Sequence, residues 1–263
     1  MSRIQFFELH EQSWLPSAIR DAVTDTLQFG FNLSKAYAPV IPLLNSALHD
    51  TGRQTVVDLC SGGGGPWLDL ARRLQERVPA LRIWLTDKYP NRGAVRNVQA
   101  RDEEHIVVYE TAVDAMDVPK GLRGFRTMFT SFHHFSPEAG RAILQNAVDA
   151  GEGMGIFEVT RRSLSSIPLI LGWVLLLVGC TPWIRPFRWS RLFWTFLIPV
   201  IPAVLLFDGM VSCLRTYRPE ELRQILSGVV GNDYCWEIGE SSSGKVPIVY
   251  LIGYPKSVAT AIV

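Results

Sequence analysis

Short apolar runs alternate with amphipathic stretches along most of the chain. Seven runs have the length of buried strands, and they cover residues 54–59, 81–86, 105–109, 124–132, 155–159, 234–239 and 247–253. Four stretches between them carry apolar residues at helical spacing, and they cover residues 66–78, 91–102, 137–150 and 219–230. Because strands alternate with helices, we predict an α/β fold with right-handed crossovers and a mainly parallel sheet.

Local end signals sharpen this prediction. Ser136 and Gly151 bracket the helix predicted at 137–150, as an N-cap and a C-terminal glycine. The last two strands are joined by the short stretch 240–245. A connection this short fits a hairpin better than a crossover, so we expect the final strand to be antiparallel.

Two regions lie outside the alternation. Residues 1–50 carry Leu15, Ile19 and Val23 near helical spacing, which predicts an N-terminal helical cap whose apolar stripe packs into the core. Residues 163–207 form an apolar insert, which we also expect to be helical. The remaining segments, 51–162 and 208–263, would then form one core domain.

The insert has its own composition. Residues 163–184 contain no charge, and neither do residues 192–207. Between these two segments stand Arg185, Arg188 and Arg191, with no acidic residue. Four of the eight tryptophans lie within the insert, at positions 173, 183, 189 and 194.

A span of 22 uncharged residues is long enough to cross a bilayer, which needs about 20. A crossing hairpin would, however, place the three arginines outside, against the positive-inside tendency. Three interpretations remain: a segment in one leaflet with tryptophans and arginines at the headgroups, an apolar lid over a greasy acceptor, or a homodimer interface. All three predict an acceptor site bordered by apolar surface.

Composition narrows the class of protein and its location. Hydrophobic residues make up 48% of the chain and charged residues 19%, and the net charge is +1. This balance excludes a disordered charged tail and argues against nucleic acid as a partner. The four cysteines form no Cys-x-x-Cys pair, and the first 25 residues resemble no secretory signal. We therefore expect a cytoplasmic protein, peripheral on the inner face of a membrane.

The candidate chemistry begins at the first predicted strand. Asp58 ends it, and four consecutive glycines follow at 62–65, where glycine permits positive φ and close approach to a ligand. Asp87 ends the next strand, where a carboxylate can accept both ribose hydroxyls of a nucleoside. Counted from Gly62, Trp67 stands where a dinucleotide-binding fingerprint has its last glycine or alanine, so that motif does not fit. A phosphate-binding P-loop does not fit either, because no Gly-Lys-Ser/Thr tripeptide follows. Alternatively, the glycines form a purely structural turn, and Asp87 is a helix N-cap or turn aspartate.

The pattern Asp58-x-x-x-Gly62-x-Gly64, with Asp87 after strand two and Asp114-Ala115 after strand three, resembles the class I S-adenosylmethionine-dependent methyltransferases. The resemblance covers about 52–162 and 216–254. It implies a Rossmann-like seven-stranded sheet with helices on both faces, and S-adenosylmethionine as the cofactor.

The resemblance also implies roles for individual residues. Asp58 and the amides around Ser61, Gly62 and Gly64 would hold the methionyl end of the cofactor. Asp87 would bind the ribose. Cys60 stands where the family usually has its first loop glycine, so this cysteine has to adopt that backbone geometry.

Further along, Asp114 would accept a hydrogen bond from the adenine amino group, and Ala115 would offer its backbone amide. Thr130 and Ser131 would line the pocket at the end of strand four. N-terminal helices often cover the donor site in related folds, so the side chains at positions 14 and 37, a tryptophan and a tyrosine, are candidates for the pocket wall.

His133 and His134 are the candidate catalytic bases, since histidine titrates near neutrality and both follow strand four. Their alternative role is structural, with one ring packed inside and the other capping the next helix. Adjacent histidines on a strand face opposite ways, and no cluster with ligand spacing accompanies them, so we expect no metal. Glu158 ends strand five and either faces the acceptor or pairs with Arg161 or Arg162.

Together these patterns predict a methyltransferase acting on a hydrophobic or lipid-like small molecule. The alternative is a non-catalytic module that is recruited to a membrane or partner through the insert. A nucleic-acid methyltransferase is disfavoured because the chain has no basic arm. The acceptor atom, oxygen, nitrogen or carbon, is left open.

Overall fold

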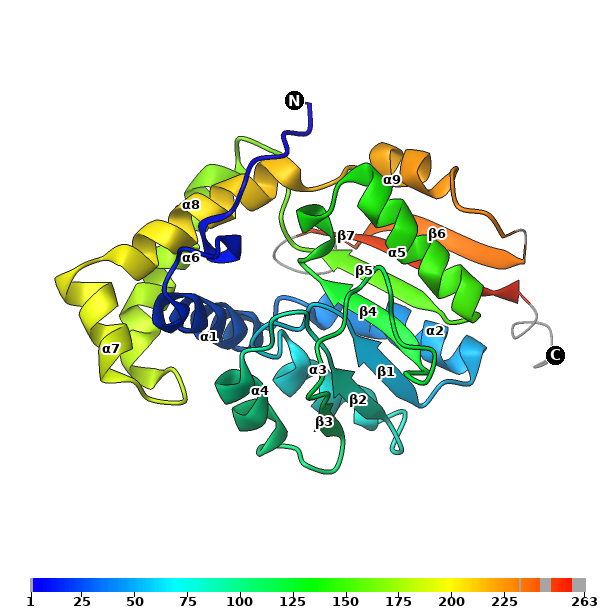
Figure 1. Ribbon diagram of the computed structural model, residues 1–263, viewed down its shortest axis with the longest axis horizontal. Coiled ribbons are helices and arrows are strands. Elements are labelled where there is room, and N and C mark those ends of the chain that lie inside the picture. Colours follow the sequence, from blue (N-terminus) through cyan, green and yellow to red (C-terminus); the bar gives the residue numbers. More distant parts are fainter. Residues whose placement is uncertain (1, 232, 242–246, 257–263) are drawn as a thin grey trace.

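The computed structural model describes residues 2–231, 233–241 and 247–256, and its centre is a seven-stranded sheet in the order β3-β2-β1-β4-β5-β7-β6 (Figure 1). The strands are β1 (Thr55–Asp58), β2 (Arg82–Leu85), β3 (Ile106–Val108), β4 (Phe125–Phe129), β5 (Met154–Glu158), β6 (Tyr234–Ser241) and β7 (Ile248–Pro255). The first five are parallel, and β7 is antiparallel to both β5 and β6. The predicted sheet is thereby confirmed. Most of the predicted hairpin connection at 240–245 lies outside the described residues.

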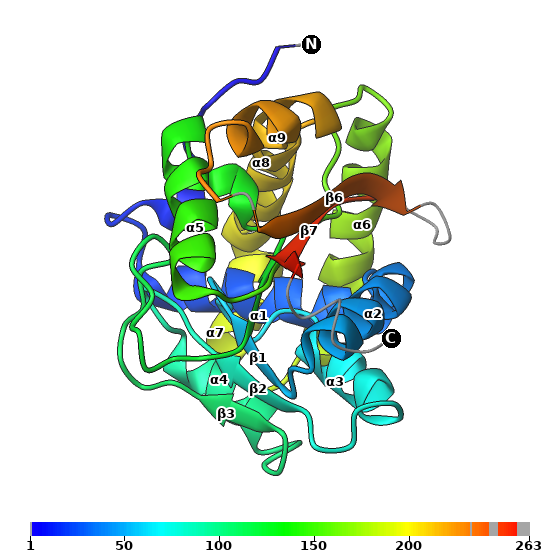
Figure 2. The ribbon, with the colours of Figure 1, turned by 90° about the vertical axis from the view of Figure 1, so that its right-hand side faces the viewer.

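Helices cover both faces of the sheet, as predicted. On one face lie α2 (Ile41–Thr51), α3 (Trp67–Gln75) and α4 (Arg92–Gln99), which pack on strand residues such as Val56. On the other lie α5 (Pro137–Ala150) and α9 (Pro219–Leu226), which share a core with the neighbouring Val57 (Figure 2). Successive strand residues point to opposite faces, so one apolar run contributes to two cores.

The end signals of α5 act as the sequence indicated. The Oγ of Ser136 accepts a hydrogen bond from the Ala139 amide at 3.2 Å. Gly151 closes the helix with φ at 67°, a conformation that costs glycine little.

A third apolar core lies beside the sheet. It joins α1 (Ser17–Ser34) to α6 (Ser166–Cys180) and α8 (Val200–Arg215), with Val23, Val174 and Leu205 among its buried residues. Figure 1 shows α6 and α8 as an arm beside the sheet, and α1 packs against this arm. The insert is helical, as expected, and α8 continues through the expected boundary between residues 207 and 208.

The arm is bent at its far end. Helix α7 (Trp189–Leu192) continues into a π-helical turn at Phe193–Leu197, which meets α8 at 76°. Pro199 stands at the break, where its missing amide cannot continue a helix. The helical stretch Ser166–Trp183 is long and apolar enough to cross a membrane, and 22% of it is buried within the protein.

Candidate functional site

The carboxyl ends of β1, β2 and β4 meet at one edge of the sheet, because these strands are parallel neighbours. Asp58 is the last residue of β1, Asp87 follows β2, and Thr130 follows β4. The glycine loop starts between them and leads into α3. The structure therefore brings together three of the side chains that the sequence assigned to the cofactor.

Asp58 lies buried beneath this edge, with 1% of its surface exposed. Its Oδ1 accepts a hydrogen bond from the Thr127 hydroxyl and its Oδ2 accepts one from the Ser61 hydroxyl, both at 2.7 Å. Burial raises the pKa of Asp58 to about 7, although these two hydrogen bonds favour the charged form. Asp58 is thus an interior group that holds the loop.

Asp87 ties the loop to the end of β2. Its carboxylate oxygens accept hydrogen bonds from the amides of Gly62 and Tyr89, each at 2.7 Å. The side chain is half-buried, and a carboxylate has lone pairs beyond these two bonds. It can therefore accept further hydroxyl donors at the sheet edge.

The loop backbone takes left-handed conformations where the sequence placed them. Gly62 and Gly64 have φ of 54° and 98°. A Cβ at Gly64 would lie 2.8 Å from the Val98 side chain, so glycine is required there. Cys60 also adopts a positive φ, 58°, as the family resemblance implied. Burial raises the pKa of the Cys60 thiol, which is therefore neutral at physiological pH.

Asp114 lies on the same side, after β3. Its Oδ2 accepts a hydrogen bond from Lys88 Nζ at 2.7 Å, and its Oδ1 accepts one from the Met116 amide at 3.0 Å. The Lys88 ammonium lowers the pKa of Asp114. The neighbouring Ala115 is buried. Asp114 therefore stays ionised and is partly open to solvent.

The end of β4 is covered by the N-terminal cap. Thr130 has a φ of 44° and its hydroxyl is hydrogen-bonded to the Tyr37 hydroxyl. Ser131 is buried, and its Oγ has no hydrogen-bond partner among the residues described. Tyr37 thus lies where a wall was expected, whereas Trp14 is 65% exposed.

The prediction that β4 runs to residue 132 was wrong, as was the expectation that the two histidines face opposite ways. The left-handed Thr130 ends the strand, since an extended chain cannot contain that φ. A 3-10 turn, Phe132–His134, follows. Successive side chains in such a turn are about 120° apart, whereas those in a strand point to opposite faces. The His133 and His134 rings can therefore stack, with centroids 4.4 Å apart.

His133 is an interior group with no exposed side-chain surface. Its Nδ1 lies 2.7 Å from Glu158 Oε2 and its Nε2 lies 3.3 Å from Glu8 Oε1. Burial alone would lower the pKa of His133, but the two carboxylates outweigh it and raise the pKa to about 9. His133 is therefore an imidazolium at neutral pH. Glu158 pairs with His133 instead of Arg161 or Arg162.

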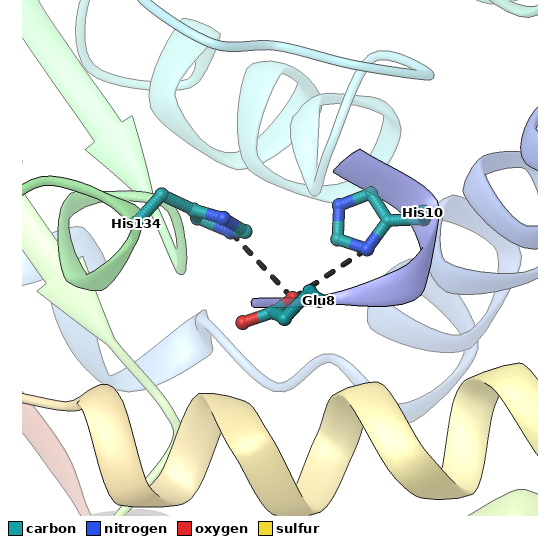
Figure 3. Close-up of side chains that lie close together, drawn as sticks. All are labelled: Glu8, His10 and His134. Atoms are coloured by element: carbon teal, nitrogen blue, oxygen red, sulfur yellow. Dashed lines mark ion pairs between the residues drawn. The ribbon is translucent and has the colours of Figure 1, made fainter. Parts of the chain in front are cut away.

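His134 is different, because 21% of its side chain is exposed and burial lowers its pKa. Its Nδ1 is hydrogen-bonded to Glu11, and its Nε2 lies 4.0 Å from Glu8 Oε2. His10 Nδ1 lies 3.5 Å from the same oxygen (Figure 3). It also lies 2.9 Å from Asp208 Oδ2. One ligand-type atom each from Glu8, His10 and His134 lies within 4.8 Å of the others, so these three residues could hold a divalent cation.

The sequence did not reveal the partners of these histidines. Glu8 and Glu11 lie more than 120 residues before His134, and Arg215 lies 81 residues after it. Arg215 binds the Glu11 carboxylate at 2.9 Å and the His134 carbonyl at 2.7 Å. No spacing rule connects such distant positions; only the docking of the N-terminal segment between the turn and α8 does.

Comparisons with known proteins place the fold. No protein-family model matches the sequence, and a search of curated proteins finds no match. The plantazolicin methyltransferase BpumL in complex with SAH superposes with a TM-score of 0.55 at 10% identity, over 91% of this chain and 96% of that chain. Human N-acetylserotonin methyltransferase in complex with SAM gives a TM-score of 0.51 at 14% identity, over 92% of this chain and 59% of that one. The chain therefore has the class I S-adenosylmethionine-dependent methyltransferase fold.

Proposed function

We propose that the protein is an S-adenosylmethionine-dependent methyltransferase that acts on a hydrophobic or lipid-like acceptor at a membrane surface. The observation that carries the proposal is the sheet edge at which Asp58, the glycine loop and Asp87 meet within this fold. The similar structures bind SAM or SAH, as their descriptions state. Methyl transfer is the activity that this arrangement supports best.

The residues at the edge fit the proposed cofactor. Asp87 offers carboxylate lone pairs for the two ribose hydroxyls, and the ionised Asp114 offers an acceptor for the adenine amino group. The unpartnered Oγ of Ser131 supports a polar ligand at the end of β4. In the proposed site, the loop amides from Ser61 to Gly64 and the Ala115 amide complete the contacts.

The chain's own task in this reaction is to align the acceptor and remove its proton. S-adenosylmethionine supplies a methyl group that its sulfonium already activates, so proximity and alignment provide most of the rate. We assign removal of this proton to His134 as the general base. His134 is neutral and partly exposed, and its Nδ1 is hydrogen-bonded to Glu11. His133, buried and charged, positions the turn.

The surface of the insert supports a membrane location. Leu169, Leu175, Trp189, Phe196 and Leu197 are each more than 55% exposed, a density of apolar groups that water alone disfavours. Exposed tryptophans are typical of a bilayer interface. We propose that this surface enters one leaflet, where an apolar acceptor resides.

The structure corrects one detail of that interpretation. Arg188 and Arg191 were expected at the headgroups, but both pair with Asp25 on α1, and Arg191 is 1% exposed. A guanidinium buried against a carboxylate is unavailable to lipid. Because this pairing fastens the tip of the insert to α1, it supports a peripheral arrangement over a crossing hairpin.

We also propose a location on the cytoplasmic side, which the thiols support. Cys60, Cys180, Cys213 and Cys235 are all free. Free thiols persist in a reducing compartment, which supports the inner face of the membrane as the place of action.

Calorimetric titration of S-adenosylmethionine and S-adenosylhomocysteine tests the proposal. We expect the wild type to bind both. Loss of the ribose hydrogen bonds should weaken binding roughly 100-fold in Asp87→Ala, and less in Asp87→Asn, which keeps an acceptor oxygen. Asp117→Ala, at an exposed carboxylate, should bind like the wild type. A folded wild type that binds neither compound would overturn the proposal.

A further inference from the structure

A cavity of about 310 Å³ lies apart from the sheet edge, between α1, α3 and the turn after α6. Four cationic side chains from separate segments line it: Lys35, Arg72, Arg101 and Arg185. We call it the basic cavity. Its volume lies at the lower end of the range for small-molecule sites.

The positive charge of the basic cavity is largely uncompensated. Arg72 pairs with Asp69 at 3.2 Å, and Asp69 is the acidic residue of the lining. Within the described part of the chain, Lys35, Arg101 and Arg185 have no carboxylate within ion-pair distance. Cations from four segments that converge on one hollow favour an anionic ligand.

The position of the cavity indicates where such an anion comes from. Trp183 lines the cavity, is 67% exposed, and ends the apolar helical stretch of the insert. Arg185 follows two residues later and is exposed too. The cavity thus adjoins the surface that we place in the leaflet, at the level where a headgroup would lie.

We infer that the basic cavity binds the phosphate of an anionic phospholipid headgroup while the insert contacts the acyl chains. Arg101 and Arg185 neutralise the charge of that phosphate. The inference rests on the membrane contact proposed above and adds its lipid preference: the protein selects membranes rich in anionic lipid.

Vesicle sedimentation tests this inference with full-length protein. We expect the wild type to bind phosphatidylcholine vesicles containing 30% phosphatidylglycerol at least tenfold more tightly than pure phosphatidylcholine vesicles. Each cation near an anionic surface contributes about fivefold in affinity. Arg101→Gln combined with Arg185→Gln should therefore lose most of the preference.

Arg77→Gln combined with Arg82→Gln is the matched control, since both arginines are exposed and neither lines the basic cavity. Equal loss in this control would show general surface attraction and overturn the headgroup site. An unchanged preference in the cavity variants would overturn it too.

The two proposals fail in different ways. If no vesicle of either composition binds the protein, the membrane contact itself is wrong. If both kinds bind equally, the membrane contact stands and the headgroup site alone is wrong. Cofactor binding, measured by calorimetry, should be the same in the cavity variants and the wild type, because these residues lie outside the sheet edge.

Discussion

The Asp58 carboxyl group is buried, and burial disfavours its ionised form. Its hydrogen bonds from Thr127 and Ser61 favour the charged form, but burial dominates and raises its pKa to about 7. The folded state therefore holds the Asp58 proton more tightly than the unfolded chain does. By linkage, stability falls as pH rises from about 4, the ordinary value, to about 7, and is flat above it.

We predict that Asp58→Asn removes this pH dependence. Near pH 4 the variant should be about as stable as the wild type, and at pH 8 it should be more stable by a few kcal/mol, because each pKa unit is worth about 1.4 kcal/mol. Urea unfolding at pH 4.5, 6 and 8 measures the difference. The exposed Asp117→Asn serves as control. A stability gap between Asp58→Asn and wild type that stays constant across pH would refute the assignment.

At the scale of elements, the insert is held by polar contacts as well as by its apolar core. Arg191 and Asp25 are each 1% exposed, and Arg191 also donates to the Ile184 carbonyl at 3.1 Å. Two charges buried together are tolerated because each satisfies the other. The pair fixes the far end of the insert onto α1.

Removal of Asp25 should therefore destabilise the protein strongly. Asp25→Ala leaves Arg191 buried without its partner, and we expect a loss of about 3–5 kcal/mol in the free energy of unfolding, measured by urea denaturation. Asp21→Ala is the matched control, because Asp21 is 34% exposed and lies 3.7 Å from Arg188. It should cost no more than about 1 kcal/mol. Similar losses in both variants would contradict the account.

At the scale of the whole molecule, three segments that are distant in sequence form the cluster of charged groups around His133 and His134. The N-terminal stretch brings Glu8 and Glu11, the turn after β4 brings His133 and His134, and α8 brings Asp208 and Arg215. The sheet positions the turn, and the third core positions α8 against it. The position and surroundings of the proposed base, His134, therefore depend on how the arm packs against the sheet.

We predict that His134→Gln lowers kcat about 10²–10⁴-fold with a hydroxyl acceptor and leaves cofactor binding unchanged. Since burial lowers the pKa of His134 below the ordinary histidine value of 6.5, wild-type activity should still exceed half of its maximum at pH 6.5. His105→Gln, whose ring pairs with nearby Asp102, should retain full activity. Wild type treated with EDTA should remain active. Loss on chelation, restored by zinc, would instead assign Glu8, His10 and His134 to a metal.

The sequence by itself determined the strands, the helices, their order, and the residues of the glycine loop. These are local properties: hydrophobic periodicity, a helix cap such as Ser136, and a left-handed position such as Gly64 depend on neighbours within a few residues. The ends of the strands depend on more than the local sequence. Strand β4 ends three residues before its predicted end because Thr130 adopts a left-handed conformation that is unusual for threonine.

Only the tertiary structure decided which distant groups meet. The contact of Glu11 with His134, the burial of Arg191 against Asp25, and the convergence of four cations on the basic cavity all join segments that are far apart in sequence. No periodicity in the sequence shows which residue a charged side chain will pair with. A glutamate that will be solvated and one that will be buried are identical in the sequence. Their environment, and with it their pKa and their chemistry, exists only once the chain has packed.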